Sequence, residues 1–181
     1  MTFAPLTTAR LVLRRLTAAD ATAVAAYRAD PAIARYQAWH PSDAEAARLA
    51  PWFEQHEATA AGDAEGVGLL LAIRLRDGGG LIGDCTLRVR SDEPDTAELG
   101  YSLAPAHHGR GYATEAVAAL CAWALTDLGV RRIVAVTDIR NRPSIALLER
   151  VGMRRTACVE SKLRGELTHT CWYELPAPPL G

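Results

Sequence analysis

Residues 105–116 read Pro-Ala-His-His-Gly-Arg-Gly-Tyr-Ala-Thr-Glu-Ala and lie between two regular patterns. Before them, apolar and polar or small residues alternate from Thr96 to Ala104, which is typical of a half-buried strand. After them, apolar residues recur at helical spacing from Ala113 to Leu128, and Gly129 is suited to end that helix. The sequence therefore predicts a strand, a glycine-bearing loop and a long helix in direct succession.

The predicted loop has the features of a phosphate site. The first backbone N–H groups of a helix have no partner within it and carry partial positive charge, so they attract anions. Gly109 and Gly111 would let a ligand approach the backbone closely. A Walker loop would need a lysine here, and a dinucleotide fingerprint would need a small residue at Thr114 and an acidic residue within 129–133. We therefore expect the loop to bind a pyrophosphate of another kind, with a simple chain turn as the alternative.

Two segments resemble motifs of the GNAT acetyltransferases. Residues 108–116, His-Gly-Arg-Gly-Tyr-Ala-Thr-Glu-Ala, resemble the acetyl-CoA signature [Gln/Arg]-x-x-Gly-x-[Gly/Ala], with His108 in the place of Gln or Arg. They look most like the RimJ/RimL branch of ribosomal-protein N-terminal acetyltransferases. Residues 141–152, Asn-x-x-Ser-x-x-Leu-x-Glu-x-x-Gly, resemble the second family motif. The resemblance covers about residues 8–175.

The resemblance implies an α+β fold, a seven-stranded, mixed, mostly antiparallel sheet with about four helices. Residues 1–181 would form one GNAT domain, with a tail at 176–181. The sheet would be splayed between its fourth and fifth strands, at 96–104 and 132–138. These two strands flank the long helix, so a right-handed crossover should make them parallel.

The resemblance also implies acetyl-CoA as co-substrate. The pantetheine arm would lie in the splay, beside the strand that ends at Leu103. The pyrophosphate would sit on the N–H groups of 109–113. The implied cofactor contacts are Leu103, His108, Gly109, Arg110, Gly111, Tyr112, Ala113, Thr114, Asn141 and Ser144.

In such an enzyme, an amine attacks the thioester directly and no acyl-enzyme forms. The backbone N–H of Leu103 should stabilise the oxyanion. The ammonium form of the acceptor must first lose a proton, so a base or a water chain is expected. Glu98, in the Glu-x-Gly-Tyr pattern of the family, is the preferred base, and Asp84 and His40 are alternatives. An exposed glutamate that pairs with an arginine is the other reading of Glu98.

The leaving thiolate needs a proton donor. Many GNAT enzymes use a tyrosine of the second motif, and Leu148 stands at that position. Ser144 is the remaining hydroxyl, and the RimL-like branch is thought to use a serine there. Its alternative role is a helix-cap hydroxyl that bonds its own backbone.

The resemblance implies that the acceptor would be a protein N-terminal α-amine or a small-molecule amine. The candidates for lining its cleft are Tyr36, Trp39, His40, Asp84, His169 and Trp172. A second hypothesis, prompted by Leu148, is a catalytically inactive acyl-CoA-binding or sensor protein of the same fold. The resemblance to the RimJ/RimL branch is also compatible with a homodimer.

Composition limits the other classes of function. The chain has 181 residues, 49% hydrophobic and 23% charged, and a formal net charge of −1, which gives no field that favours nucleic acid or an anionic membrane. Neither an 18-residue apolar run nor a secretory signal is apparent, so we expect a cytoplasmic protein. Cys85, Cys121, Cys158 and Cys171 form no Cys-x-x-Cys pair, so we expect core cysteines in a reducing compartment and no metal site.

Overall fold

The computed structural model describes residues 3–37 and 68–177. The strands are β1 (Leu6–Thr7), β2 (Leu11–Arg15), β3 (Gly68–Leu75), β4 (Leu81–Val89), β5 (Thr96–Leu103), β6 (Arg132–Asp138), β7 (Arg154–Leu163) and β8 (Glu166–Pro176). The helices are α1 (Ala21–Arg28), α2 (Pro31–Ala34), α4 (Tyr112–Trp123) and α5 (Arg142–Arg150), with 3-10 turns η1 (Ala18–Asp20) and η2 (Pro105–His107) and a π-helical turn η3 (Ala124–Leu128).

The described strands form one sheet in the order β1-β2-β3-β4-β5-β6-β8-β7. Among them, β5 and β6 are the one parallel pair, as the crossover through α4 predicts. The sheet has eight strands where seven were expected. The additional strand is β1, whose two residues pair with Leu13 and Val12 of β2.

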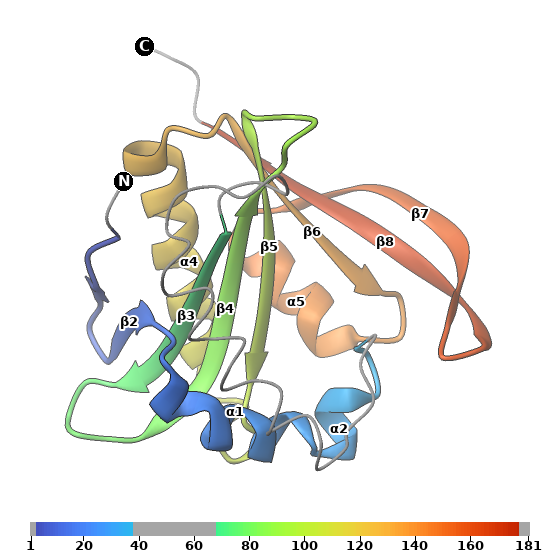
Figure 1. The fold of residues 1–181 in the computed structure, drawn as a ribbon. Helices are drawn as coiled ribbons and strands as arrows, with labels where there is room; N and C mark the ends of the chain where they lie inside the picture. The colour runs from blue at the N-terminus through green and yellow to red at the C-terminus, as the bar shows by residue number, and fades with distance from the viewer. Residues whose placement is uncertain (1–2, 38–67, 178–181) are drawn as a thin grey trace.

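The parallel pair opens toward the ends of its strands. Its register runs from Thr96↔Arg132 to Leu99↔Ala135, although β5 continues to Leu103 and β6 to Asp138. Figure 1 shows the two strands diverging from a common start, with α5 behind the opening. The expected splay is confirmed, and it lies at the end of β5 that leads into the glycine-bearing loop.

Helices cover both faces of the sheet (Figure 1), and the hydrophobic core on one face is larger than the core on the other. On one face, α4 and α5 bury Val117, Leu120 and Leu148 in the larger hydrophobic core. On the other face, α1 buries Val24 and Tyr27 in a smaller core. Because the larger core anchors both α4 and α5, it fixes the start of each helix relative to the splay.

A buried carboxylate anchors the turn before α1. Asp20 is 5% exposed and accepts hydrogen bonds from Arg14 Nη1 at 2.7 Å, Arg14 Nη2 at 2.9 Å and the Thr17 backbone N–H at 2.9 Å. Burial alone would raise the pKa of this carboxyl, but the bonds from Arg14 and Thr17 outweigh it and lower the pKa.

The bonds that Arg14 and Thr17 donate to Asp20 should make the protein less stable in acid. A carboxyl whose pKa is lowered by folding contributes its full stabilisation above its unfolded pKa of about 3.9 and loses it as the pH falls through the folded value. We expect Asp20→Asn to reduce the free energy of unfolding at pH 7, with a difference from wild type that shrinks below about pH 4. Urea unfolding at several pH values measures the difference in free energy of unfolding between the variant and wild type. A difference independent of pH would contradict the lowered pKa of Asp20.

The prediction for the cysteines is correct for two of them and wrong for the other two. Cys85 and Cys121 are buried and free. Cys158 and Cys171 form a disulfide between directly paired positions of β7 and β8. Sequence spacing gave no sign of this pair because antiparallel pairing, not a short motif, brings the two residues opposite each other.

Two kinds of feature are absent from residues 3–37 and 68–177. No helix there is long and apolar enough to cross a membrane. No group of three or more His, Cys, Asp or Glu side chains in those ranges is arranged to hold a metal ion.

Candidate active site

The start of α4 has the backbone features that an anion site requires. Gly109 and Gly111 have φ values of 72° and 77°, which are left-handed and favour glycine. Gly111 is the N-cap of α4 and provides no side-chain cap, so the first N–H groups of the helix stay available. A Cβ atom at Gly109 would meet nothing within 4 Å, and one at Gly111 would lie 3.4 Å from Arg10 Nη2. These residues fit a pyrophosphate held by backbone amides.

The N-terminal segment supports this loop from outside. Glu115, in the first turn of α4, accepts from Thr8 Oγ1 at 2.6 Å, Arg10 N at 2.9 Å and Arg10 Nε at 2.7 Å. Arg10 Nη1 also donates to the carbonyl of Arg110 at 2.9 Å, and its guanidinium lies 4.5 Å from the centre of the Tyr112 ring. Arg10 thus brings positive charge beside the predicted phosphate loop. The sequence predicted no role for Arg10 in the site, because about 100 residues separate it from the motif.

The backbone of Leu103 points toward the splay. Ala104 N donates to Ile82 O of β4 at 2.8 Å, so alternation along the strand turns the N–H and C=O of Leu103 to the opposite side, where β6 has moved away. The Leu103 carbonyl lies 2.7 Å from His108 Nε2. The histidine that replaces the Gln or Arg of the motif therefore fastens the loop to the end of β5.

Residues of α5 and β5 meet across the splay. Asn141 caps α5, and its side-chain oxygen accepts from Ser144 N at 3.3 Å, as the sequence predicts. The Tyr101 hydroxyl lies 2.8 Å from Ser144 Oγ and 3.3 Å from Ser144 O. Burial raises the pKa of Tyr101 to about 12, although the bond to Ser144 lowers it. The sequence did not identify Tyr101 as a site residue. Its place in the Glu-x-Gly-Tyr pattern could have indicated it, because Tyr101 stands two residues before Leu103 and so lies on the same face of β5.

The other predicted contacts lie around these two helix starts. Thr114 Oγ1 accepts from Arg150 Nη1 at 3.1 Å, which joins the first turn of α4 to the last turn of α5. Arg110 is exposed on the loop between the two glycines. The loop, Leu103, Asn141 and Ser144 are thus gathered at one end of the splayed strands.

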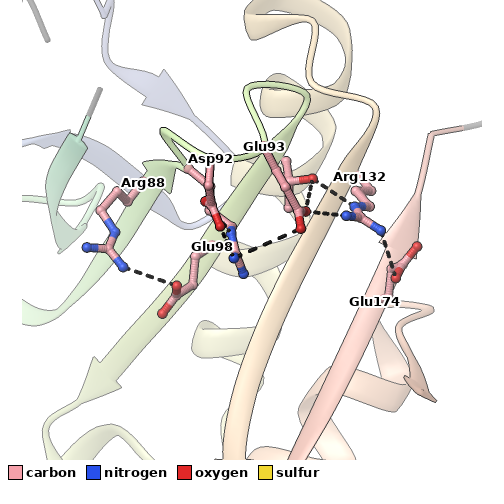
Figure 2. Close-up of polar contacts among 8 residues, drawn as sticks. Arg88, Asp92, Glu93, Glu98, Arg132 and Glu174 are labelled. Carbon is pink, nitrogen blue, oxygen red and sulfur yellow. Dashed lines mark hydrogen bonds and ion pairs between the residues drawn. The ribbon is translucent and has the colours of Figure 1, made fainter. Parts of the chain in front are cut away.

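Glu98 lies away from the open end of the splay, where the loop, Leu103 and Ser144 meet. It lies in the part of β5 that pairs with β6, five residues before Leu103, or about 17 Å along an extended strand. Its carboxylate is 3.2 Å from Arg88 Nη2, and its side chain is 40% exposed. Figure 2 shows this ion pair beside a second group of charges, in which Arg132 contacts Glu93 and Glu174. The geometry argues against direct proton transfer by Glu98, and it fits the exposed ion pair that was the alternative reading.

Substitution of Glu98 tests this placement. We expect Glu98→Gln to keep kcat within about fivefold of wild type, since an exposed ion pair contributes about 0–1 kcal/mol. Removal of a true general base would cost about 10²–10⁴-fold. Steady-state kinetics over pH 6–9 distinguishes the two results, and a hundredfold loss with unchanged acetyl-CoA affinity would restore Glu98 as a base that acts through water.

Asp84, the alternative base, lies nearer the splay. It pairs with Ser102 in register, one residue before Leu103, and is 2% exposed. Its carboxylate accepts from the Tyr27 hydroxyl and from Arg28 Nη2 at 2.8 Å, so it ties α1 to β4. Burial and the adjacent Asp84 raise the pKa of Tyr27 well above its usual value, which keeps this phenol a donor.

The remaining acceptor candidates divide into three cases. The Tyr36 hydroxyl donates to Arg140 O at 3.2 Å, and His169 O accepts from Ile139 N at 2.9 Å, so both meet the loop before α5. Trp172 is half-buried on β8, opposite Val136 of β6. Trp39 and His40 lie outside the described residues.

A splayed parallel pair, a glycine loop at a helix start and a strand backbone turned into the splay define the acetyltransferase class that uses acetyl-CoA. The model of the acetyltransferase (GNAT) domain matches residues 10–154, and the chain belongs to this family.

Particular relatives agree with this class. The chain is 30% identical over 171 residues to the uncharacterized N-acetyltransferase p20 of Bacillus licheniformis, covering 93% of each chain. A putative ribosomal-protein-serine acetyltransferase from Vibrio cholerae has a similar structure, with a TM-score of 0.77, 24% identity and coverage of 95% and 97%. A spermidine N-acetyltransferase from Vibrio cholerae, solved with CoA and spermine, has a TM-score of 0.80, 18% identity and coverage of 94% and 97%. At these identities, the two structures support the fold alone.

Proposed function

We propose that this acetyltransferase transfers the acetyl group to a primary amine by direct attack, without an acyl-enzyme. The observation that carries the proposal is the position of the Leu103 backbone, which faces the splay beside the anion-binding start of α4. An N–H group in that place would stabilise the negative charge that builds on the carbonyl oxygen. The described cysteines give no support to a covalent route, since Cys85 and Cys121 are buried and Cys158 and Cys171 are bonded to each other.

Each element at the splay has a part in this reaction. The amides of the loop from Gly109 to Ala113 hold the pyrophosphate, with Arg10 and Arg110 at the rim. Asn141 orders the first turn of α5, and Ser144 supplies a proton to the leaving thiolate. Asp84 is the described carboxylate nearest to Leu103 in register, and is a base or a positioning group. The acceptor enters beside the loop before α5, which Tyr36 and His169 each contact.

Two acceptor classes are open to such a site, a protein N-terminal α-amine and a small-molecule amine. The similarity to RimJ/RimL-type motifs favours the α-amine, and the fold is shared with a spermidine N-acetyltransferase. Fold likeness alone does not choose between them.

A panel of amines tests the proposal. Purified protein and acetyl-CoA are mixed with peptides that begin with Ser or Ala, with the same peptides blocked at the N-terminus, and with spermidine. We expect CoA release, read with a thiol dye, with at least one free amine, and an added acetyl group by mass spectrometry. Release with free but not blocked peptides would assign the α-amine. Acetyl-CoA binding without release on any amine would favour the acyl-CoA-binding alternative.

A further inference from the structure

The phenol that many GNAT enzymes place on the helix of the second motif is absent here. Its position holds Leu148, which is 1% exposed in the larger core and has no proton to give. The opposite wall of the splay carries a phenol instead. Tyr101 of β5 reaches across to the first turn of α5 and contacts both oxygens of Ser144.

One further contact orders the turn that carries Ser144. The Ser144 backbone N–H is held by Asn141 Oδ1 at 3.3 Å, which fixes the turn that carries the hydroxyl. Tyr101 Oη is 2.8 Å from Ser144 Oγ, a normal distance for a hydrogen bond between hydroxyl groups. When Tyr101 donates to Ser144 Oγ, the serine proton is left to point elsewhere. In the reverse arrangement, that proton would be held by Tyr101.

We propose that Tyr101 is a positioning residue that donates to Ser144 Oγ and aims the serine proton at the leaving thiolate. This inference rests on the proposed function and assigns one further residue to it. As the C–N bond forms and the C–S bond breaks, the sulfur takes the proton of Ser144. The hydrogen bond from Tyr101 stabilises the charge that builds on Oγ, and the proton released by the acceptor nitrogen restores the hydroxyl. Protons therefore balance with no added reactant.

The high pKa of Tyr101 agrees with this role. Burial keeps the phenol protonated through the working pH range, so it remains a donor and does not compete as a base. Other titratable groups near it are Cys85 and Cys121, both buried and with raised pKa values, so neither introduces a charge beside the pair at neutral pH.

The test compares Tyr101→Phe, Ser144→Ala and the double variant with Tyr173→Phe. Tyr173 is a matched control, because it lies buried in the same sheet and its hydroxyl has no hydrogen-bond partner within the described ranges. We expect Tyr101→Phe to lower kcat about tenfold, the effect of one hydrogen bond to a charged group, with KM for acetyl-CoA nearly unchanged. The double variant should be no slower than Ser144→Ala, while Tyr173→Phe keeps wild-type kcat. Additive losses, or equal kcat in Tyr101→Phe and Tyr173→Phe, would overturn the inference.

A second measurement needs no acceptor. The thiol of bound CoA is titrated by its ultraviolet absorbance in wild type and in each variant. A donor aimed at the sulfur lowers the pKa of that thiol, so Tyr101→Phe should raise it by about half a unit or more. Identical titrations would refute the role of Tyr101 even if every amine tested proved to be a poor acceptor. A shifted titration without turnover on any amine would instead retain Tyr101 and refute the proposed function.

Discussion

Gly111→Asp is expected to weaken acetyl-CoA binding by at least about a hundredfold. Anion binding at a helix start depends on open N–H groups and the positive end of the helix dipole, and a carboxylate at the N-cap occupies both. The N-cap position of Gly111 and its φ of 77° place the new side chain next to these groups, with its Cβ 3.4 Å from Arg10 Nη2. The carboxylate would therefore also neutralise a nearby cation. Isothermal titration calorimetry with acetyl-CoA measures the loss.

Gly111→Asn is the matched control for this result. Asparagine has nearly the same size as aspartate, tolerates a left-handed backbone and carries no charge. It separates electrostatic repulsion from steric blocking and backbone strain. We expect a smaller loss of affinity in Gly111→Asn, and a similar melting temperature in both variants because two side chains of nearly the same size occupy the same left-handed position. Unchanged binding in Gly111→Asp would place the pyrophosphate elsewhere and end the loop assignment.

Asp84→Asn should cause the largest loss of stability among the substitutions considered. The carboxylate is 2% exposed and is bonded to Tyr27 and Arg28, so its removal takes a charge from a buried ion pair. Breaking a buried pair by removing one partner costs about 3–5 kcal/mol. In a chain of this length, that corresponds to a fall in melting temperature of about 6–20 °C.

Glu98→Gln is the matched control, because it makes the same change from carboxylate to amide in an exposed pair with Arg88. We expect it to cost less than about 1 kcal/mol. Calorimetric melting of both variants tests the contrast, and equal losses would show that the bonds from Tyr27 and Arg28 to Asp84 stabilise the fold no more than an exposed ion pair does. If Asp84→Asn, assayed well below its melting temperature, also loses kcat with unchanged KM, Asp84 acts in the chemical step, as a base or a positioning group.

Local features of the site were predictable because their causes are local. A glycine with positive φ, an asparagine before a helix and an apolar stripe that ends in Gly129 each act over a few residues. The order of strand, helix and strand also gave the parallel pair, since the handedness of the crossover leaves few arrangements. The two-residue strand β1 was missed because so short an element carries no periodicity.

Contacts between distant residues were predicted poorly. The Glu-x-Gly-Tyr pattern gives the order of residues along β5, but not where pairing with β6 ends, so it does not show that Glu98 lies in the paired part of the strand beside Arg88. The same limit hid the contact between Tyr101 and Ser144, the support of Glu115 by Thr8 and Arg10, and the bond between Cys158 and Cys171.

The chain alone thus determined the family, the glycine-bearing loop at the start of α4 and the helix caps, because backbone conformation and capping depend on neighbours in sequence. Only the folded sheet decided which side chains share the splay, because strand register and the divergence of β5 from β6 set those distances. The positions of the two candidate bases, Glu98 and Asp84, and the contact of Tyr101 with Ser144 are therefore set by the tertiary structure.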